Sequence, residues 1–167
     1  MNTASKLSLA VVTLLAIGAS SAQAQSATIS ATATVLTPLT LTGAAPLAFG
    51  SVYPGVAKTI APGDATSGRF TFAGAAAAQV SFNFPSNPVN LTGAGTLPIG
   101  TYTGLHNTTN TTTGATAFTP GVTAVLANLS GTGALFLFIG ATVSPTPTQT
   151  AGAYTGTITL NAVYTGS

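Results

Sequence analysis

Apolar and polar residues alternate one by one in short segments of this chain, and this period of two constrains the fold most. The segments comprise residues 28–35, 69–73, 79–84 and 157–164. Successive side chains of a β-strand point to opposite faces of the sheet, so such a segment places its apolar residues on one face. We therefore predict that these segments are half-buried strands of an antiparallel sheet.

Glycine and proline separate the alternating segments from one another. The chain contains 19 glycines and 10 prolines, many of them in clusters typical of tight turns, at residues 53–55, 61–64, 85–88, 119–121 and 130–133. Threonine and other β-branched residues are common, and they disfavour helices. Turns at this spacing predict an all-β domain of about seven to nine strands, an antiparallel β-sandwich, with a closed barrel as the alternative.

The N-terminal segment, residues 1–24, has the layout of a secretory signal peptide. Lys6 supplies a positive charge, residues 7–19 form an apolar run, and small residues follow. The alternative is a membrane anchor, but the run is shorter than the roughly 20 apolar residues that a transmembrane helix needs. We predict cleavage between Ala24 and Gln25. The mature protein, residues 25–167, would then be one secreted domain without a transmembrane segment, located from the periplasm to the cell surface.

Ionisable side chains are scarce. Only 2% of the residues are charged, whereas 46% are hydrophobic. Beyond the signal peptide, the charged residues are Lys58, Asp64 and Arg69, and His106 is the single imidazole. Nucleic-acid binding needs several Lys or Arg residues to neutralise phosphates, so the composition excludes a nucleic-acid partner. The high hydrophobic content supplies a core and argues against disorder.

The same residue inventory argues against catalysis and metal binding. A glycosidase needs a pair of carboxylates, and the mature chain has only Asp64, which we interpret as a turn former. A Ser-His-Asp triad would need His106, which we expect to be a solvated loop residue, and the Gly-x-Ser-x-Gly motif is absent. Zinc and calcium sites need several His, Cys or acidic ligands. We therefore predict no enzymatic activity, no catalytic residues, no metal site and no cofactor.

Two stretches depart from the alternating pattern. Residues 105–117 are rich in Thr and Asn, and we interpret them as a long, exposed hairpin connection. The run 135–139 is apolar on both faces, which indicates a strand buried on both sides. The alternative is a contact patch in which Phe136 and Phe138 form an interface with a neighbouring molecule.

The first mature segment, residues 25–37, allows two interpretations. Ile29, Ala31, Ala33 and Val35 lie on one face of the segment if it is extended. It is either the first strand of the domain or an N-terminal extension. As an extension, it would add as a donor strand to an open sheet edge or groove of a neighbouring copy.

Three stretches of the sequence resemble a family of secreted bacterial proteins. They are residues 46–55 (PLAFGSVYPG), residues 82–93, in which FNFP precedes VNLTG, and residues 152–164 (GAYTGTITLNAVY). The family is the secreted β-sandwich group catalogued as domain of unknown function 4402, and the ending is also similar to that of spore-coat U pilins of the chaperone–usher type. The resemblance implies an immunoglobulin-like sandwich at the cell surface and brings no catalytic residues. The chain has no cysteine, and so it departs from those pilins in lacking their disulfide.

The near-neutral composition also bears on function. Soluble proteins commonly protect their sheet edges with lysines, and this chain has few to use. We therefore expect a structural subunit of an extracellular fibre, pilus or biofilm matrix that self-associates into filaments, with a periplasmic chaperone or usher as a further partner. The alternative is a monomeric surface adhesin or carbohydrate-binding module that uses the rings of Tyr53, Tyr102, Tyr154 and Tyr164.

Overall fold

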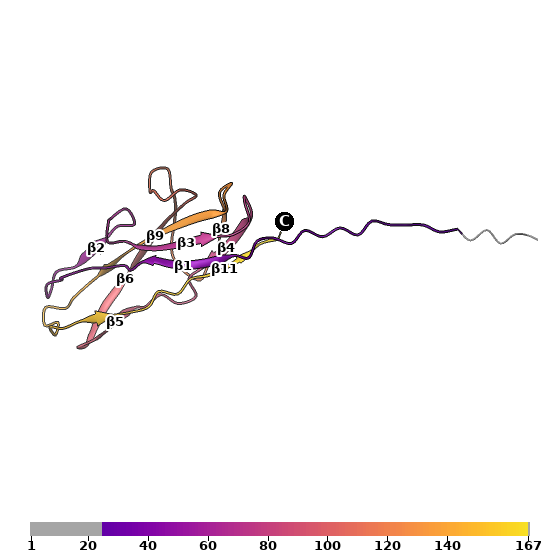
Figure 1. Cartoon of the computed structure of the whole chain (residues 1–167). Coiled ribbons are helices and arrows are strands. Elements are labelled where there is room, and N and C mark those ends of the chain that lie inside the picture. The colour runs from indigo at the N-terminus through magenta and orange to yellow at the C-terminus, as the bar shows by residue number, and fades with distance from the viewer. Residues whose placement is uncertain (1–24, 167) are drawn as a thin grey trace, which may run out of the picture. The chain divides into compact units, whose positions relative to one another are not determined.

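The structure is a computed structural model that describes residues 25–166, so Ala24, the rest of the predicted signal peptide and Ser167 lie outside the described residues. The described chain is built from eleven β-strands and contains no helix (Figure 1). The strands are β1 (Thr40–Ala45), β2 (Lys58–Ile60), β3 (Gly68–Ala73), β4 (Gln79–Asn83), β5 (Asn90–Gly93), β6 (Thr96–Asn107), β7 (Thr116–Phe118), β8 (Val125–Asn128), β9 (Ala134–Val143), β10 (Tyr154–Thr155) and β11 (Asn161–Tyr164). The prediction of an all-β chain is confirmed.

The strands form two antiparallel sheets of unequal size. The larger sheet has eight strands, with β1, β3, β9, β6, β5 and β10 in that order, β2 paired to β9, and β7 paired to β6. The smaller sheet has three strands in the order β11, β4, β8. The strand number exceeds the expected range of about seven to nine. The excess arises from β2, β7 and β10, whose two or three residues are too few to show alternation.

Two alternating segments form strands as predicted. Residues 69–73 lie in β3 and residues 79–83 form β4. The apolar side chains of Phe72, Val80 and Phe82 are each at most 2% exposed. Their neighbours along each strand point to the opposite face, which explains why alternation located both strands correctly.

The last alternating segment forms a strand only in part. Ile158, Leu160, Ala162 and Tyr164 all pack against the main core, as their shared face predicted. Residues 161–164 pair with β4, but residues 156–160 belong to no strand. The C-terminal chain is therefore apolar on its inner face along its length and hydrogen-bonded to a sheet only at its end.

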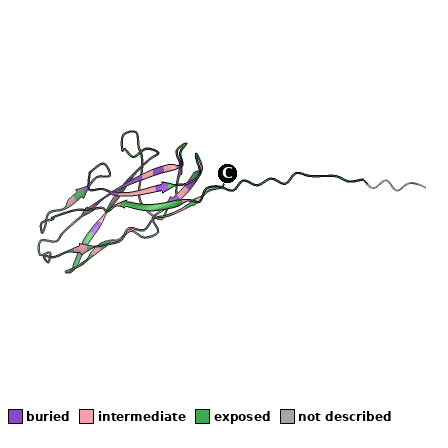
Figure 2. Cartoon of the chain, viewed as in Figure 1, coloured by how far each residue is buried: buried purple, intermediate pink, exposed green. Residues whose placement is uncertain are grey.

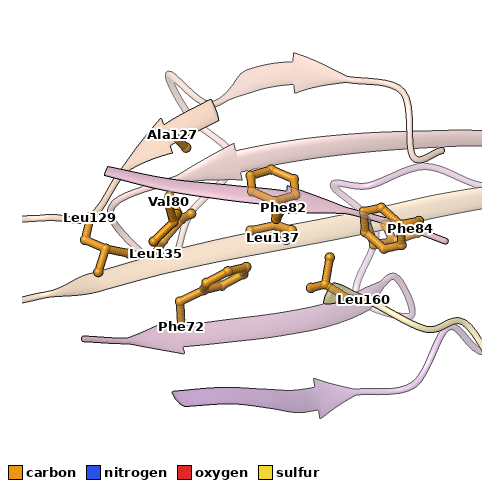
Figure 3. Packing of buried hydrophobic residues seen from close by; sticks show 10 residues of the cluster. Phe72, Val80, Phe82, Phe84, Ala127, Leu129, Leu135, Leu137 and Leu160 are labelled. Atoms are coloured by element: carbon orange, nitrogen blue, oxygen red, sulfur yellow. The ribbon is translucent and has the colours of Figure 1, made fainter. Parts of the chain in front are cut away.

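The main hydrophobic core lies between the two sheets (Figure 3). Leu135 and Leu137 of β9 and Phe72 of β3 face Val80 and Phe82 of β4. The rings of Phe72 and Phe82 meet edge to face with their centroids 5.9 Å apart. Burying one such side chain contributes roughly 1.5–3 kcal/mol, so this cluster is the principal contact that holds the sheets together.

A second cluster lies further along the larger sheet and consists of Leu97, Ile99, Ala141 and Val143. Tyr102 of β6 packs against both clusters. The β6–β9 register shifts between Gly100 and Thr103, and Thr101 adopts a positive φ of 49° at this bulge. Tyr102 donates a 2.7 Å hydrogen bond to the Pro88 carbonyl, and burial raises the pKa of its phenol to about 12. The bulge thus directs one aromatic side chain to the junction of the two clusters.

Strand β9 is buried on both faces, as its apolar run indicated. Phe138 is 6% exposed and Phe136 is half-buried. Phe138 is the direct register partner of Arg69, so the two side chains share a face. Arg69 donates a 3.4 Å hydrogen bond to the Asn110 side chain, which places the connection between β6 and β7 over this face. Little of Phe138 is therefore presented to a neighbouring molecule.

The connection between β6 and β7 is shorter than residues 105–117, because Leu105 to Asn107 continue β6 and Thr116 begins β7. The expectation that His106 is a solvated loop residue is wrong. His106 is half-buried in β6, and its ring centroid lies 6.1 Å from that of Phe82 and 6.0 Å from that of Phe118. The pairing of β6 with β9 determines the face of the sheet to which the His106 side chain points. The polar residues around His106 in the sequence do not reveal this pairing.

The segment 25–36, which we call the arm, contains no strand, although residues 28–35 alternate as a strand would. The chain divides into two units after Thr34. Ile29 is 96% exposed and Val35 is 94% exposed, and Figure 2 shows exposure along the described part of the arm. The prediction that residues 28–35 are a half-buried strand of the domain is therefore wrong for this structure.

Candidate functional site

A groove of about 880 Å³ opens in the unit that begins at Val35. Residues 45–54 form one wall, and residues 145–158 form another. The side chains that line it are mostly apolar, among them Leu47, Phe49, Val52, Phe70, Leu91, Leu97, Ile99, Ile139 and Ile158. A concave apolar surface of this size is typical of a binding site.

The groove lies where the smaller sheet no longer covers the larger one. The main core receives side chains from β4 and β8 of the smaller sheet. Within the described residues, the second cluster is instead packed against by six partly buried residues outside that sheet, Leu47, Phe49, Val52, Leu91, Tyr102 and Tyr154. Ile139 and Ile158 line the groove from the first cluster, and Leu97 and Ile99 line it from the second. The groove therefore marks a gap in the layer that covers the larger sheet.

Unpaired sheet edges adjoin this gap. Strand β1 ends the larger sheet on one side, and its last residue, Ala45, lines the groove. Strand β11 ends the smaller sheet, and the strandless residues 156–158 that precede it also line the groove. A strand edge presents N–H and C=O groups that are free to pair with a further strand. The groove thus combines apolar lining with backbone groups that can bind an extended segment.

Hydrogen bonds fix the wall formed by residues 145–158. The side-chain amide of Gln149 donates hydrogen bonds to the Thr96 carbonyl at 3.0 Å and to the Tyr154 hydroxyl at 2.8 Å. The Tyr154 hydroxyl in turn donates to the Thr150 carbonyl at 2.6 Å. Strand β10 pairs closely with β5, and a Cβ atom at Gly93 would overlap the Ala153 carbonyl. The wall is therefore preformed, and its position depends on glycine at residue 93.

The wall formed by residues 45–54 is also held by hydrogen bonds. The Ala48 amide donates to the Thr66 carbonyl at 2.9 Å. The Lys58 ammonium donates to the Ser51 carbonyl at 3.2 Å. Gly55, at a φ of 76°, donates to the Thr146 carbonyl at 3.0 Å and so joins this wall to the opposite one. Hydrogen bonds within the chain therefore hold both walls.

The lining suits an uncharged apolar segment rather than proton transfer, since none of the lining residues in the described range is charged. Asp64 accepts a 2.7 Å hydrogen bond from the Ala61 amide, which confirms its interpretation as a turn former. His106 lies in the aromatic cluster with Phe82 and Phe118, and burial lowers its pKa. Among residues 25–166, no group of three or more His, Cys, Asp and Glu side chains could hold a metal ion.

The four tyrosines do not gather on one binding face. Tyr102 and Tyr164 donate hydrogen bonds to the carbonyls of Pro88 and Thr37. Tyr154 is bound within the groove wall described above. Tyr53 is 72% exposed and presents most of its ring to solvent.

The sequence-predicted donor residues and interface residues lie in different environments. Ala31 and Ala33 are exposed in the arm together with Ile29 and Val35. Phe136 and Phe138 belong to the central strand of the larger sheet and do not line the groove. Of these two sets, only the arm residues are fully exposed in the structure.

Comparisons with protein-family models, with curated proteins and with solved structures found no match to this chain. Within residues 25–166 there is no helix that is long and apolar enough to span a membrane.

The groove itself is not visible in the alternation pattern. Its lining includes residues 46–52, Pro54, Pro88, Leu91 and residues 152–158, which are distant in sequence and which the fold brings to one place. No short window of the sequence contains that arrangement.

Proposed function

We propose that this protein is a structural subunit of an extracellular bacterial fibre, in which the arm of one copy adds as a strand to the groove of the next copy. The observation that carries the proposal is that one chain has both an exposed, alternating arm and an apolar groove flanked by unpaired sheet edges. Strand addition binds through backbone hydrogen bonds and through alternate side chains at once. Such a head-to-tail contact does not close on itself and produces a filament.

The arm and the groove are complementary in chemistry. The arm, residues 25–36, carries no charged side chain, and neither does the groove lining. Burying Ile29 and Val35 would contribute roughly 1.5–3 kcal/mol each. Each backbone hydrogen bond formed with a sheet edge would add about 0.5–1.5 kcal/mol. Ala31 and Ala33 keep the middle of the inserted face small.

In this proposal, the groove is the place of a missing strand in the layer that covers the larger sheet. We interpret the domain as an immunoglobulin-like sandwich that lacks one strand, in keeping with its resemblance to the secreted family and to spore-coat U pilins. The arm of the neighbouring copy would supply that strand between β1 and residues 156–164. The complete sandwich would then exist only within the fibre.

The cellular route follows from the same proposal. The signal peptide would deliver the chain to the periplasm, and assembly would place it on the cell surface. An open groove with free sheet edges invites aggregation before assembly, so a periplasmic chaperone would cover it until an usher admits the subunit. The proposal assigns no catalytic residue and no cofactor.

Sedimentation and electron microscopy of the mature protein test this function. The double variant Ile29→Ser, Val35→Ser removes the apolar face of the arm and changes only side chains that are at least 94% exposed. The control Thr28→Ser, Thr34→Ser changes the opposite face of the same segment. We expect fibres from the parent and the control, and folded monomers from the double variant. If the double variant forms fibres at the same concentration as the parent, the proposal is wrong.

The second candidate function is a monomeric carbohydrate-binding module. The exposed ring of Tyr53 favours it, because an aromatic face can stack on a sugar. A glycan array with the monomeric double variant separates the two functions. Tight binding of one glycan, together with a parent protein that stays monomeric, would favour the module over the fibre.

A further inference from the structure

Arg69 lies on the face of the larger sheet that points away from the smaller sheet, which we call the outer face. Phe70 and Phe72 of β3 pack into the main core, so Arg69 and Thr71 beside them point to the outer face. Phe70 also lines the groove. The groove and Arg69 are therefore on opposite faces of the sheet, and an occupant of the groove would leave Arg69 accessible.

A row of two hydroxyl groups and one aromatic ring lies next to Arg69 on the outer face. Thr71 is the direct register partner of Thr42 on one side and of Phe136 on the other. Thr42 is exposed, and Thr71 and Phe136 are half-buried. Arg69 is two residues from Thr71 along β3, and diagonal neighbours across strands are roughly 7–8 Å apart, within reach of long side chains. Arg69 and this row therefore form one continuous surface.

The connection between β6 and β7 is held in place beside Arg69. The Asn107 side-chain amide donates hydrogen bonds to the carbonyls of Thr111 and Thr113 at 2.9 Å and 3.1 Å. These bonds shape the loop that carries Asn110, whose side-chain oxygen accepts the 3.4 Å hydrogen bond from Arg69. The polar groups around the Arg69 guanidinium are therefore ordered by contacts within the chain.

The chain itself supplies no good anionic partner for Arg69. Asp64 is the only acidic side chain in the sequence, and its carboxylate accepts a 2.7 Å hydrogen bond from the Ala61 amide in its own turn. The bond from Arg69 to Asn110 has a neutral acceptor, and its 3.4 Å exceeds the usual range of about 2.7–3.2 Å. A guanidinium presents a planar fork of N–H donors that matches a carboxylate. Because a second copy would also have only Asp64 to offer, the charge of Arg69 favours a different molecule as its partner.

We propose that Arg69, together with Thr42, Thr71 and Phe136, binds a carboxylate-bearing sugar of an acidic polysaccharide. The guanidinium would donate two parallel hydrogen bonds to the sugar carboxylate. The Phe136 ring would pack against the C–H groups of the sugar, and the threonine hydroxyls would bond to its hydroxyls. The adjacent ring and hydroxyls favour a sugar over an acidic peptide.

This inference goes beyond the proposed function, and binding by a single subunit does not depend on it. In a fibre, the site would occur once in each subunit, so one polysaccharide chain would bind several subunits at once. Such multivalent binding strengthens a weak single contact. The outer face would then attach the fibre to an acidic matrix while the groove holds its subunits together.

The first test is a titration of the mature variant Ile29→Ser, Val35→Ser with an oligogalacturonate and with the methyl ester of the same oligosaccharide. The substitutions Arg69→Gln and Asn128→Asp are each added to this protein. They change the net charge equally, but Asn128 is exposed on β8 of the smaller sheet. We expect Arg69→Gln to lower the affinity for the oligogalacturonate by at least about tenfold and Asn128→Asp to change it by less than about twofold. Equal effects of the two substitutions, or equal binding of the ester, would overturn the proposal.

The second test separates a sugar from an acidic peptide and leaves Arg69 in place. The same arm variant, with and without Phe136→Leu, is titrated with the oligogalacturonate and with an oligoglutamate of equal charge. We expect at least about tenfold tighter binding of the oligogalacturonate, and a loss of this preference in Phe136→Leu. Equal binding of the two anions before substitution would overturn the assignment to a sugar and indicate an acidic peptide. Absence of binding to both would overturn the site itself.

Discussion

The Tyr164 hydroxyl donates a 2.8 Å hydrogen bond to the Thr37 carbonyl and accepts a 2.6 Å hydrogen bond from the Ala75 amide. One side chain of β11 thus holds the start of the folded domain and the turn between β3 and β4. The point at which the arm leaves the domain is fixed to the C-terminal strand.

Replacing Tyr164 with Phe removes this hydroxyl and keeps the ring. The Ala75 amide, in a residue only 9% exposed, would lose its partner. We expect the free energy of unfolding to fall by roughly 1–3 kcal/mol, the cost of an unsatisfied buried group. Urea unfolding of the monomeric arm variant measures the change. Tyr53→Phe, at an exposed ring, is the control and should change stability by less than about 0.5 kcal/mol.

Replacing Gly93 with Ala would displace a wall of the groove. The added Cβ overlaps the Ala153 carbonyl, so β10 must move away from β5. In the monomeric variant Ile29→Ser, Val35→Ser, we expect the affinity for a peptide of residues 25–36 to fall by at least about tenfold. The control is Gly131→Ala, where a Cβ meets no atom within 4 Å. Peptide titration of both variants checks this, and equal affinities would show that the wall does not contribute to binding.

Replacing Leu137 with Ala would leave a cavity in the core between the sheets. Leu137 is 0% exposed and lies in the cluster shared by β4 and β9. We expect a loss of about 2–5 kcal/mol in the free energy of unfolding. Leu126→Ala removes the same atoms from a side chain that is 59% exposed and should cost much less. Denaturant unfolding of the pair tests whether this cluster holds the sheets together.

His106 should make the domain less stable in acid. Burial lowers the pKa of His106 in the folded protein below its ordinary value of 6.5, so the unfolded chain binds the proton more readily. The free energy of unfolding is therefore unaffected by His106 protonation above about pH 6.5. It declines as the pH falls from 6.5 toward the lower pKa of His106 in the folded protein. Urea unfolding at about pH 7.5 and about pH 5 measures the decline. In His106→Gln this decline should disappear, and an unchanged pH dependence would contradict the account.

The sequence identified the parts of the fold that depend on local side-chain direction. Alternation located β3 and β4 because each buries one face against the other sheet. The apolar run 135–139 likewise indicated the central strand β9, which is covered on both faces. These features are encoded in neighbouring residues, so a short window of sequence contains them.

The groove and the position of His106 depend on contacts between distant residues. The groove forms because the smaller sheet ends before the larger one, and no single segment records where a sheet ends. His106 turns inward because β6 pairs with β9 in a particular register. Residues 28–35 alternate as a strand would but form no strand in the structure, because alternation does not specify which sheet a segment joins. Whether residues 28–35 pair within their own domain depends on how its distant segments form the two sheets.

The central claim is that the groove of one copy is filled by the arm of another, and hydrogen exchange at residues 156–160 tests it most directly. These residues belong to no strand in the single chain, so their amides should exchange rapidly in the monomeric variant Ile29→Ser, Val35→Ser. In fibres of the parent protein, the account predicts strong protection of these amides together with those of residues 28–35. Fibres in which both segments exchange as rapidly as in the monomer would contradict it.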